Sequence, residues 1–218
     1  MVTVRGSAGS VELRLLAGVL RCPCGGALRP WGHARRRLAA MPSGWAEFWP
    51  RRGRCRECGR THVLLPADLW SRRRYGAAVI MTVLVLGARA SAAGRAAARP
   101  WAAAPGGGRR AVPGSTARSW RSRFEARADG LRGQLMRVLP LVSGAEAARP
   151  LMPSGSAGGD CLAVLEAVTA GLRRFPGLAA VASHEAAAHL SGGLWLAPAV
   201  PVLEFNTTLF PAGVISPS

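Results

Sequence analysis

The stretches RCPCGG (residues 21–26) and RCRECGRTH (residues 54–62) place two close pairs of cysteines about thirty residues apart. Each pair is followed by a glycine, Gly25 or Gly59, at the point where the backbone must turn back. Two such pairs are the typical ligand set of a structural zinc ribbon. We therefore predict one Zn²⁺ bound by Cys22, Cys24, Cys55 and Cys58.

The two cysteine pairs differ in spacing, since the second has the usual two-residue spacer and the first has only one residue. Two alternatives stay open: a degenerate site that no longer holds metal, or a redox dithiol at Cys55 and Cys58. Imidazole also binds zinc, so His62 or His33 could replace a poorly placed thiolate. Cys161 lies in a different compositional region and is expected to be a buried apolar residue.

The charge of this 218-residue chain is concentrated in its first two thirds. All 29 basic residues are arginine, and the absence of lysine excludes a P-loop lysine or a lysine Schiff base. Residues 1–149 hold 27 arginines against seven acidic residues, a balance of +20, whereas residues 150–218 have a balance of −2. Such a field attracts polyanions, nucleic acid first. The alternative is a solvated surface in an arginine-biased proteome.

Nothing in the sequence predicts a membrane segment or a secretory signal. Glu12 and Arg14 interrupt the apolar core that a signal peptide would need. The longest apolar run, residues 76–88, is shorter than the roughly twenty residues of a membrane span and is expected to form a buried helix. Cysteines in metal spacing without a signal peptide indicate the reducing cytoplasm.

The predicted fold is mainly α with a small N-terminal zinc-ribbon β module, a helix-turn-helix-like middle and a short helical tail. Residues 45–49 and 61–65 are strand candidates, and the tryptophans of the module are expected to cap a core too small to stand alone. The predicted segments are a zinc ribbon (1–66), a helical DNA-binding domain (67–142), a linker (143–159) and a helical tail with an extended C-terminus (160–218).

Three helices are predicted beyond the apolar one. Apolar residues at steps of three and four from Ala117 to Val138 predict one long helix that starts at Ser115 and ends at Pro140. Asp160 is expected to cap a helix over residues 161–175, and an alanine-rich helix is expected near 178–190.

The start of the long helix resembles a DNA-recognition helix. A turn, a hydroxyl N-cap and exposed arginines in the first turns allow an N-terminus to enter the major groove. The candidate DNA contacts are Ser115, Arg118, Ser119, Arg121 and Arg123. Sequence-independent phosphate contacts are predicted for Arg35, Arg36, Arg37, Arg51, Arg52, Arg54, Arg72, Arg73 and Arg74. The alternative is an amphipathic structural helix with a solvated arginine face.

Three stretches together resemble an uncharacterised family of high-GC bacterial proteins that joins a transposase-like zinc ribbon to a helix-turn-helix. They are CPCGG with Pro30-Trp31-Gly32, RCRECGRTHVLLP (54–66) and PGSTARSW (113–120). A weaker similarity is present at Asn206-Thr207-Thr208. The resemblance covers most of residues 1–140 and implies DNA binding beside mobile-element genes. The chain departs from the family where about fifteen Pro, Gly and Arg-rich residues replace the short turn between the two helices.

No catalytic constellation is predicted. A transposase needs three carboxylates on a strand-rich sheet, and Asp68, Asp129 and Asp160 do not lie in such a pattern. His184 and His189 are five residues apart and diverge by roughly 140° on a helix, unlike metalloprotease ligands. We expect a cytoplasmic, non-enzymatic, zinc-dependent DNA-binding protein, either a mobile-element accessory or a transcriptional regulator. The alternatives are a zinc-ribbon adaptor for a protein partner and a decayed transposase fragment.

Overall fold

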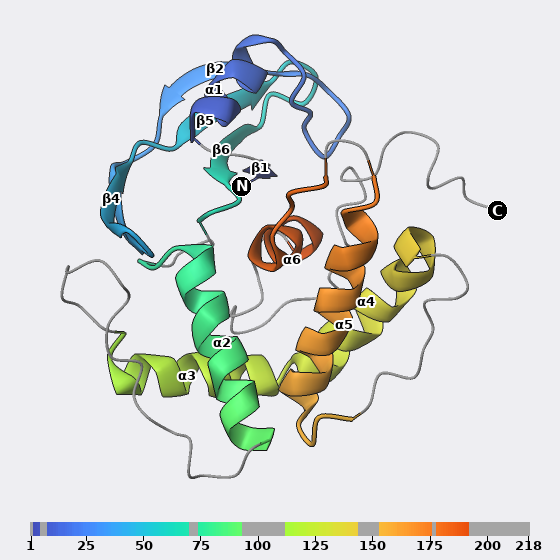
Figure 1. Cartoon of the computed structure of the whole chain (residues 1–218). Coiled ribbons are helices and arrows are strands. Elements are labelled where there is room, and N and C mark those ends of the chain that lie inside the picture. Colours follow the sequence, from blue (N-terminus) through green and yellow to red (C-terminus); the bar gives the residue numbers. More distant parts are fainter. Residues whose placement is uncertain are drawn as a thin grey trace.

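The computed structural model describes residues 2–4, 8–69, 74–92, 112–143, 153–175 and 178–191, with strands followed by helices (Figure 1). The elements are β1 (Val2–Val4), α1 (Ala8–Leu16), β2 (Leu28–His33), β3 (Arg37–Met41), β4 (Gly44–Phe48), β5 (Arg51–Cys55), β6 (Thr61–Pro66), α2 (Ala77–Ala92), α3 (Gly114–Glu125), α4 (Ala128–Ser143), α5 (Ala157–Leu172) and α6 (Ser183–Ser191). This order confirms the prediction of an N-terminal β module followed by helices. Most of the predicted linker and the C-terminal 192–218 lie outside the described residues.

Four strands form one sheet in the order β1-β6-β5-β2, with β1 parallel to β6 and the other neighbours antiparallel. Helix α1 covers one face of this sheet through Val11 and Leu15, which lie one helical turn apart and are buried. The two side chains share a small core with Leu28 and with the cysteines Cys22 and Cys55. Two of the four predicted metal ligands are therefore part of the packing of the sheet, whereas Cys24 and Cys58 are exposed.

The strands β2 and β5 continue into β3 and β4 and form one long two-stranded ribbon. The backbone N–H of Ala34 donates to the carbonyl of Pro50 at 2.7 Å and joins the two ladders. The register shifts between Pro30 and His33, where Gly32 has a φ of +80°. The ribbon runs from the four-stranded sheet toward the start of α2 (Figure 1).

The tip of the ribbon docks on the residues that precede α2. The N–H of Gly76 donates to the carbonyl of Ala40, and the N–H of Ala40 donates to the carbonyl of Arg74, both at 2.8 Å. A Cβ on Gly76 would lie 2.5 Å from the sulfur of Met41, so a larger residue here would displace the Met41 side chain. Backbone hydrogen bonds thus connect the sheet layer to the helical layer.

A second and larger core lies among α2, α3, α4, α5 and α6. The predicted apolar helix is confirmed as α2, in which Ile80 and Leu84 are fully buried. The rings of Tyr75 and Trp120 meet edge to face at 5.0 Å and hold α3 against the start of α2.

The single helix predicted from Ser115 to Pro140 is wrong, because Ala126 and Arg127 separate α3 from α4. The apolar stripe continues across the break, since Phe124 and Ala128 on either side are both buried. The burial pattern was therefore correct although the helix was not continuous.

Pro140 does not end α4, which continues to Ser143. Proline removes one backbone hydrogen bond from a helix. Leu139 and Val142 are buried on either side of it, and their packing holds the last turn in place.

The helix predicted to begin after Asp160 begins earlier, at Ala157. Its N-cap is Ser156, which has an extended backbone and accepts a hydrogen bond from the N–H of Gly159 at 3.0 Å. Asp160 lies inside the first turn instead, and its carboxylate accepts from the N–H of Ser154 at 2.6 Å.

The last described helix, α6, begins at Ser183 rather than near residue 178, because residues 179–180 form a turn. The carboxylate of Glu185 accepts the N–H of Ala182 at 3.0 Å and fixes this start. Within the part of the chain that the structure describes, none of the helices has both the length and the apolar composition to span a membrane.

Candidate metal centre

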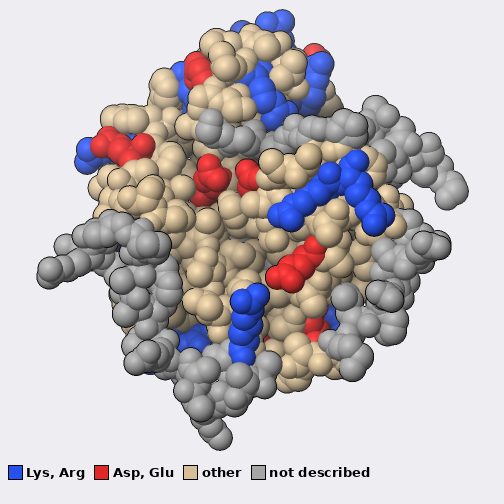
Figure 2. Space-filling view, in the orientation of Figure 1, with Lys and Arg blue, Asp and Glu red and all other residues tan. Residues whose placement is uncertain are grey.

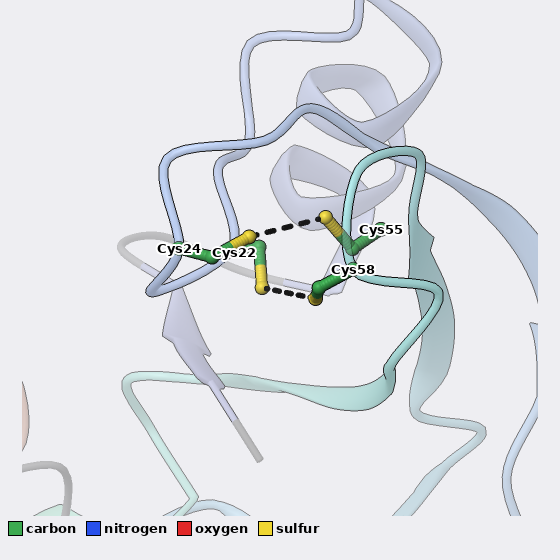
Figure 3. A group of neighbouring side chains, drawn as sticks. All are labelled: Cys22, Cys24, Cys55 and Cys58. Atoms are coloured by element: carbon green, nitrogen blue, oxygen red, sulfur yellow. Dashed lines mark hydrogen bonds between the residues drawn. The ribbon is translucent and has the colours of Figure 1, made fainter.

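The four predicted zinc ligands lie together at one end of the sheet (Figure 3). One pair comes from the loop before β2; of the other pair, Cys55 ends β5 and Cys58 lies in the loop that leads to β6. All four Sγ atoms lie within 4.8 Å of one another. The sulfurs of Cys22 and Cys58 are 3.6 Å apart, and those of Cys24 and Cys55 are 3.5 Å apart.

The sulfur spacing fits a tetrahedral metal ion. A Zn–S distance of about 2.3 Å separates neighbouring sulfurs of a regular tetrahedron by about 3.8 Å. Both short contacts join one loop to the other, and all four thiols are free of disulfides. A local redox dithiol would instead bring Cys55 and Cys58 closest together. The cluster can therefore hold a metal ion, and its all-sulfur donor set fits Zn²⁺.

The two loops close in the same way despite their different spacers. The N–H of Cys22 donates to the carbonyl of Gly26 at 2.8 Å, and the N–H of Cys55 donates to that of Arg60 at 2.9 Å. The first loop is one residue shorter, so its hydrogen bond spans four residues where the second spans five. The first loop makes a tighter turn that compensates for the missing spacer residue, and the sulfurs still converge.

Three glycines make this approach possible. Gly25 and Gly59 have φ angles of +88° and +68°, which other residues rarely adopt. Gly26 lies where the loops meet, and a Cβ there would be 2.6 Å from the sulfur of Cys55 and 2.5 Å from Cγ of Glu57. Both loops depend on the absence of side chains at these positions.

His62 supports the cluster from β6. Its side chain is only 9% exposed, and its Nε2 lies 3.2 Å from the sulfur of Cys22. Burial, the charge of the N-terminus and that of Arg60 lower the pKa of His62, so the ring is neutral near pH 7 and can donate an N–H to a thiolate. His33, the other predicted substitute ligand, contacts Arg51 at 3.1 Å instead.

The thiols of the first loop have very different affinities for their protons. The N–H of Gly26 and contacts with the other three thiols lower the pKa of Cys24 to about 7. The N–H of Cys24 lowers the pKa of Cys22, but burial and the neighbouring thiols outweigh it and raise the value to about 12. Zinc binds thiolates, so metal binding at this cluster must release protons.

Some of the predicted phosphate-contacting arginines are engaged within the protein. Arg36 forms an ion pair with Glu47 at 3.4 Å, and Arg51 pairs with Glu12. Arg37 is half-buried, and this burial lowers its pKa. These three side chains are less available to a ligand than their sequence pattern suggested.

The remaining ribbon arginines are more accessible. Arg35 is exposed, while Arg52 and Arg54 are half-buried on β5. Arg74 is exposed beside the ribbon tip, and Arg72 and Arg73 lie outside the described residues. On the visible face, arginine side chains are spread over the sheet layer at the top of Figure 2.

Helix α3 presents most of its predicted contact residues outward. Ser115, Arg118, Ser119 and Arg123 are exposed. Arg121 is half-buried because it crosses α2, where a Cβ on Gly87 would collide with its side chain. The neighbouring helix packs on one flank of α3, and the serine and arginine face remains open.

The tryptophans of the β module do not cap a core as predicted, since Trp31, Trp45 and Trp49 are 43%, 51% and 58% exposed. Trp31 lies on β2 close to two cations. The guanidinium carbon of Arg54 is 4.6 Å from its ring centroid, and that of Arg29 is 5.6 Å away. Sequence reasoning missed this group because the partners are brought together by strand pairing, and only the Arg-Pro-Trp sequence hints at it.

Comparison with known protein families finds a match for part of the chain. Residues 22–99 match the family model described as a domain of unknown function, DUF6431. No curated protein and no solved structure matches the chain. The matched segment begins at Cys22, contains all four cysteines, the ribbon and α2, and ends before α3. This segment therefore resembles an uncharacterised family, as the sequence motifs indicated.

Proposed function

We propose that this chain is a zinc-dependent DNA-binding protein without catalytic activity, acting as a mobile-element accessory or a transcriptional regulator in the cytoplasm. The observation that carries the proposal is the charge of residues 1–149, a balance of +20. Double-stranded DNA is a dense polyanion, and arginine binds phosphates and guanine edges through two parallel hydrogen bonds.

Zinc is proposed because the cysteine cluster replaces a hydrophobic core that is otherwise too small. The core under α1 contains eight buried residues, and two of them are the ligands Cys22 and Cys55. A structural zinc site supplies on the order of 10 kcal/mol of folding free energy. The convergence of all four sulfurs also favours an intact metal site over the degenerate site that a decayed transposase fragment would carry.

Helix α3 is the element that we propose to read the groove. Its open face carries Ser115, Arg118 and Ser119 near the N-terminus, where helices meet base edges and phosphates. Arg121 is proposed to position α3 on α2 rather than to contact DNA, because it already packs across Gly87. The exposed ribbon arginines would add attraction that does not depend on sequence.

A second candidate function rests on exposed apolar residues of the β3–β4 hairpin and on Trp49, which directly follows β4. Leu38, Trp45 and Trp49 are each about half exposed, at 49%, 51% and 58%. Aromatic residues are enriched at protein interfaces. These side chains would suit a zinc-stabilised adaptor that binds a protein partner.

The test is to remove zinc from the purified full-length chain with a chelator and follow both the fold and DNA binding. We expect one zinc per chain by elemental analysis. Its removal should unfold the sheet layer, as seen in tryptophan fluorescence, and weaken binding to a random-sequence duplex at least tenfold. Unchanged fluorescence and unchanged DNA affinity in the zinc-free protein would rule out zinc dependence. Zinc binding with no DNA affinity would favour the adaptor.

A further inference from the structure

The face of the four-stranded sheet opposite α1 carries a compact group of cations around one aromatic ring. Arg29 and Arg54 are direct partners across β2 and β5, and Arg52 follows on the same face. The ring centroid of Trp31 lies 5.6 Å from the guanidinium carbon of Arg29 and 4.6 Å from that of Arg54, and Trp31 is 43% exposed. We name Arg29, Trp31, Arg52 and Arg54 the ribbon platform.

The charges of the ribbon platform are not balanced by acidic residues of the sheet. Like charges directly opposite each other on antiparallel strands are destabilising. None of the described strand residues on this face is acidic; Glu12, on α1, pairs with Arg51 instead. The contacts with Trp31 offset part of the repulsion, but no described strand residue of this face supplies a negative charge to the two facing cations.

The metal centre fixes the orientation of the platform. Nε of Arg54 donates to the carbonyl of Gly59 at 3.2 Å, and Gly59 directly follows the ligand Cys58. The same guanidinium lies 4.6 Å from the centroid of Trp31. A folded second cysteine loop thus holds Arg54, and Arg54 holds one side of the ring.

We propose that the ribbon platform binds single-stranded nucleic acid by stacking an unpaired base on Trp31, with the arginines on the flanking phosphates. Such a ligand supplies both a flat π surface and closely spaced anions. In a duplex the bases are paired and stacked inside, so only an unpaired base can cover the ring. This inference rests on the proposed function and adds a second mode of binding to the duplex contacts of α3.

The test uses labelled single strands of equal length, one with bases and one with abasic sites, so that the phosphate charge is constant. Fluorescence anisotropy with the zinc-loaded chain should show weaker binding of the abasic strand. Stacking of one base predicts a loss of between about fivefold and about a hundredfold. The Trp31→Ala variant should lose this discrimination, whereas Trp31→Phe should keep most of it.

Trp45→Ala is the matched control, because Trp45 is a similarly exposed tryptophan of the same ribbon. It should discriminate between the two strands as the wild type does. Equal affinity of the wild type for both strands, with duplex binding intact, would overturn the platform and leave the proposed function standing. Absence of binding to strands and duplex alike would overturn both. Discrimination that persists in Trp31→Ala would place the base elsewhere on the protein.

Discussion

At the scale of single residues, the cysteine centre depends on glycines as much as on thiols. Gly26 lies where the two loops meet, with no room for a Cβ beside Cys55 and Glu57. The four candidate ligands could be predicted from the sequence because two close cysteine pairs are the usual donor set of a structural zinc site. The part played by Gly26 could not, since it depends on the distance between loops that are far apart in the chain.

We predict that Gly26→Ala weakens zinc binding. A methyl group at residue 26 would push the second loop away, and overpacking of this kind typically costs 1–3 kcal/mol, or about a fivefold to a hundredfold loss of zinc affinity. Competition with a chromogenic chelator measures the affinity. Gly133→Ala is the control, because a Cβ there meets no atom within 4 Å. Equal zinc affinity in both variants would mean that the loops approach each other differently.

At the scale of elements, periodicity identified the helices but not their ends. The stripe through Trp120, Phe124 and Leu131 was visible in the sequence, and those residues are buried. Neither Ala126 nor Arg127 is a proline or glycine, so the sequence has no helix-breaking residue that would predict the break. It is set by the packing of α3 and α4 against different neighbours in the helical core.

The ribbon strands were harder to predict because they are polar. Strand β2 is exposed at every position after Leu28, so it lacks the alternation that marks a half-buried strand. The pairing of Arg29 with Arg54 follows from the register of the ribbon and its bulge. Trp31 and Arg54 lie in motifs that the sequence shows, but their proximity could not be predicted from it.

The contact proposed for α3 predicts the effect of a single substitution. Arg118→Ala should weaken binding to a duplex by about fivefold to a hundredfold if it reads a base, or lower the salt slope by about one if it contacts a phosphate. Arg137→Ala is the matched control, an exposed arginine on α4 with the same change of charge. Fluorescence anisotropy at several salt concentrations measures both quantities. Identical behaviour of the two variants would remove α3 from the interface.

At the scale of the whole molecule, the described residues form a sheet layer and a helical layer, each with its own core. The small core of the sheet layer includes Cys22 and Cys55, and the helical layer has its own extensive apolar core. The ribbon tip joins them through the hydrogen bonds between Ala40, Arg74 and Gly76. Arginines are distributed over both layers, which suits a long polyanion better than a small ligand.

The measurement that tests the central claim most directly is the affinity of the zinc-loaded chain for a random-sequence duplex between about 50 and 200 mM salt. Binding through six to ten phosphates should weaken by roughly a thousandfold or more over this range, because each contact releases bound counterions. A steep fall of this kind is the result that the account predicts. The absence of binding at the lowest salt concentration would contradict it.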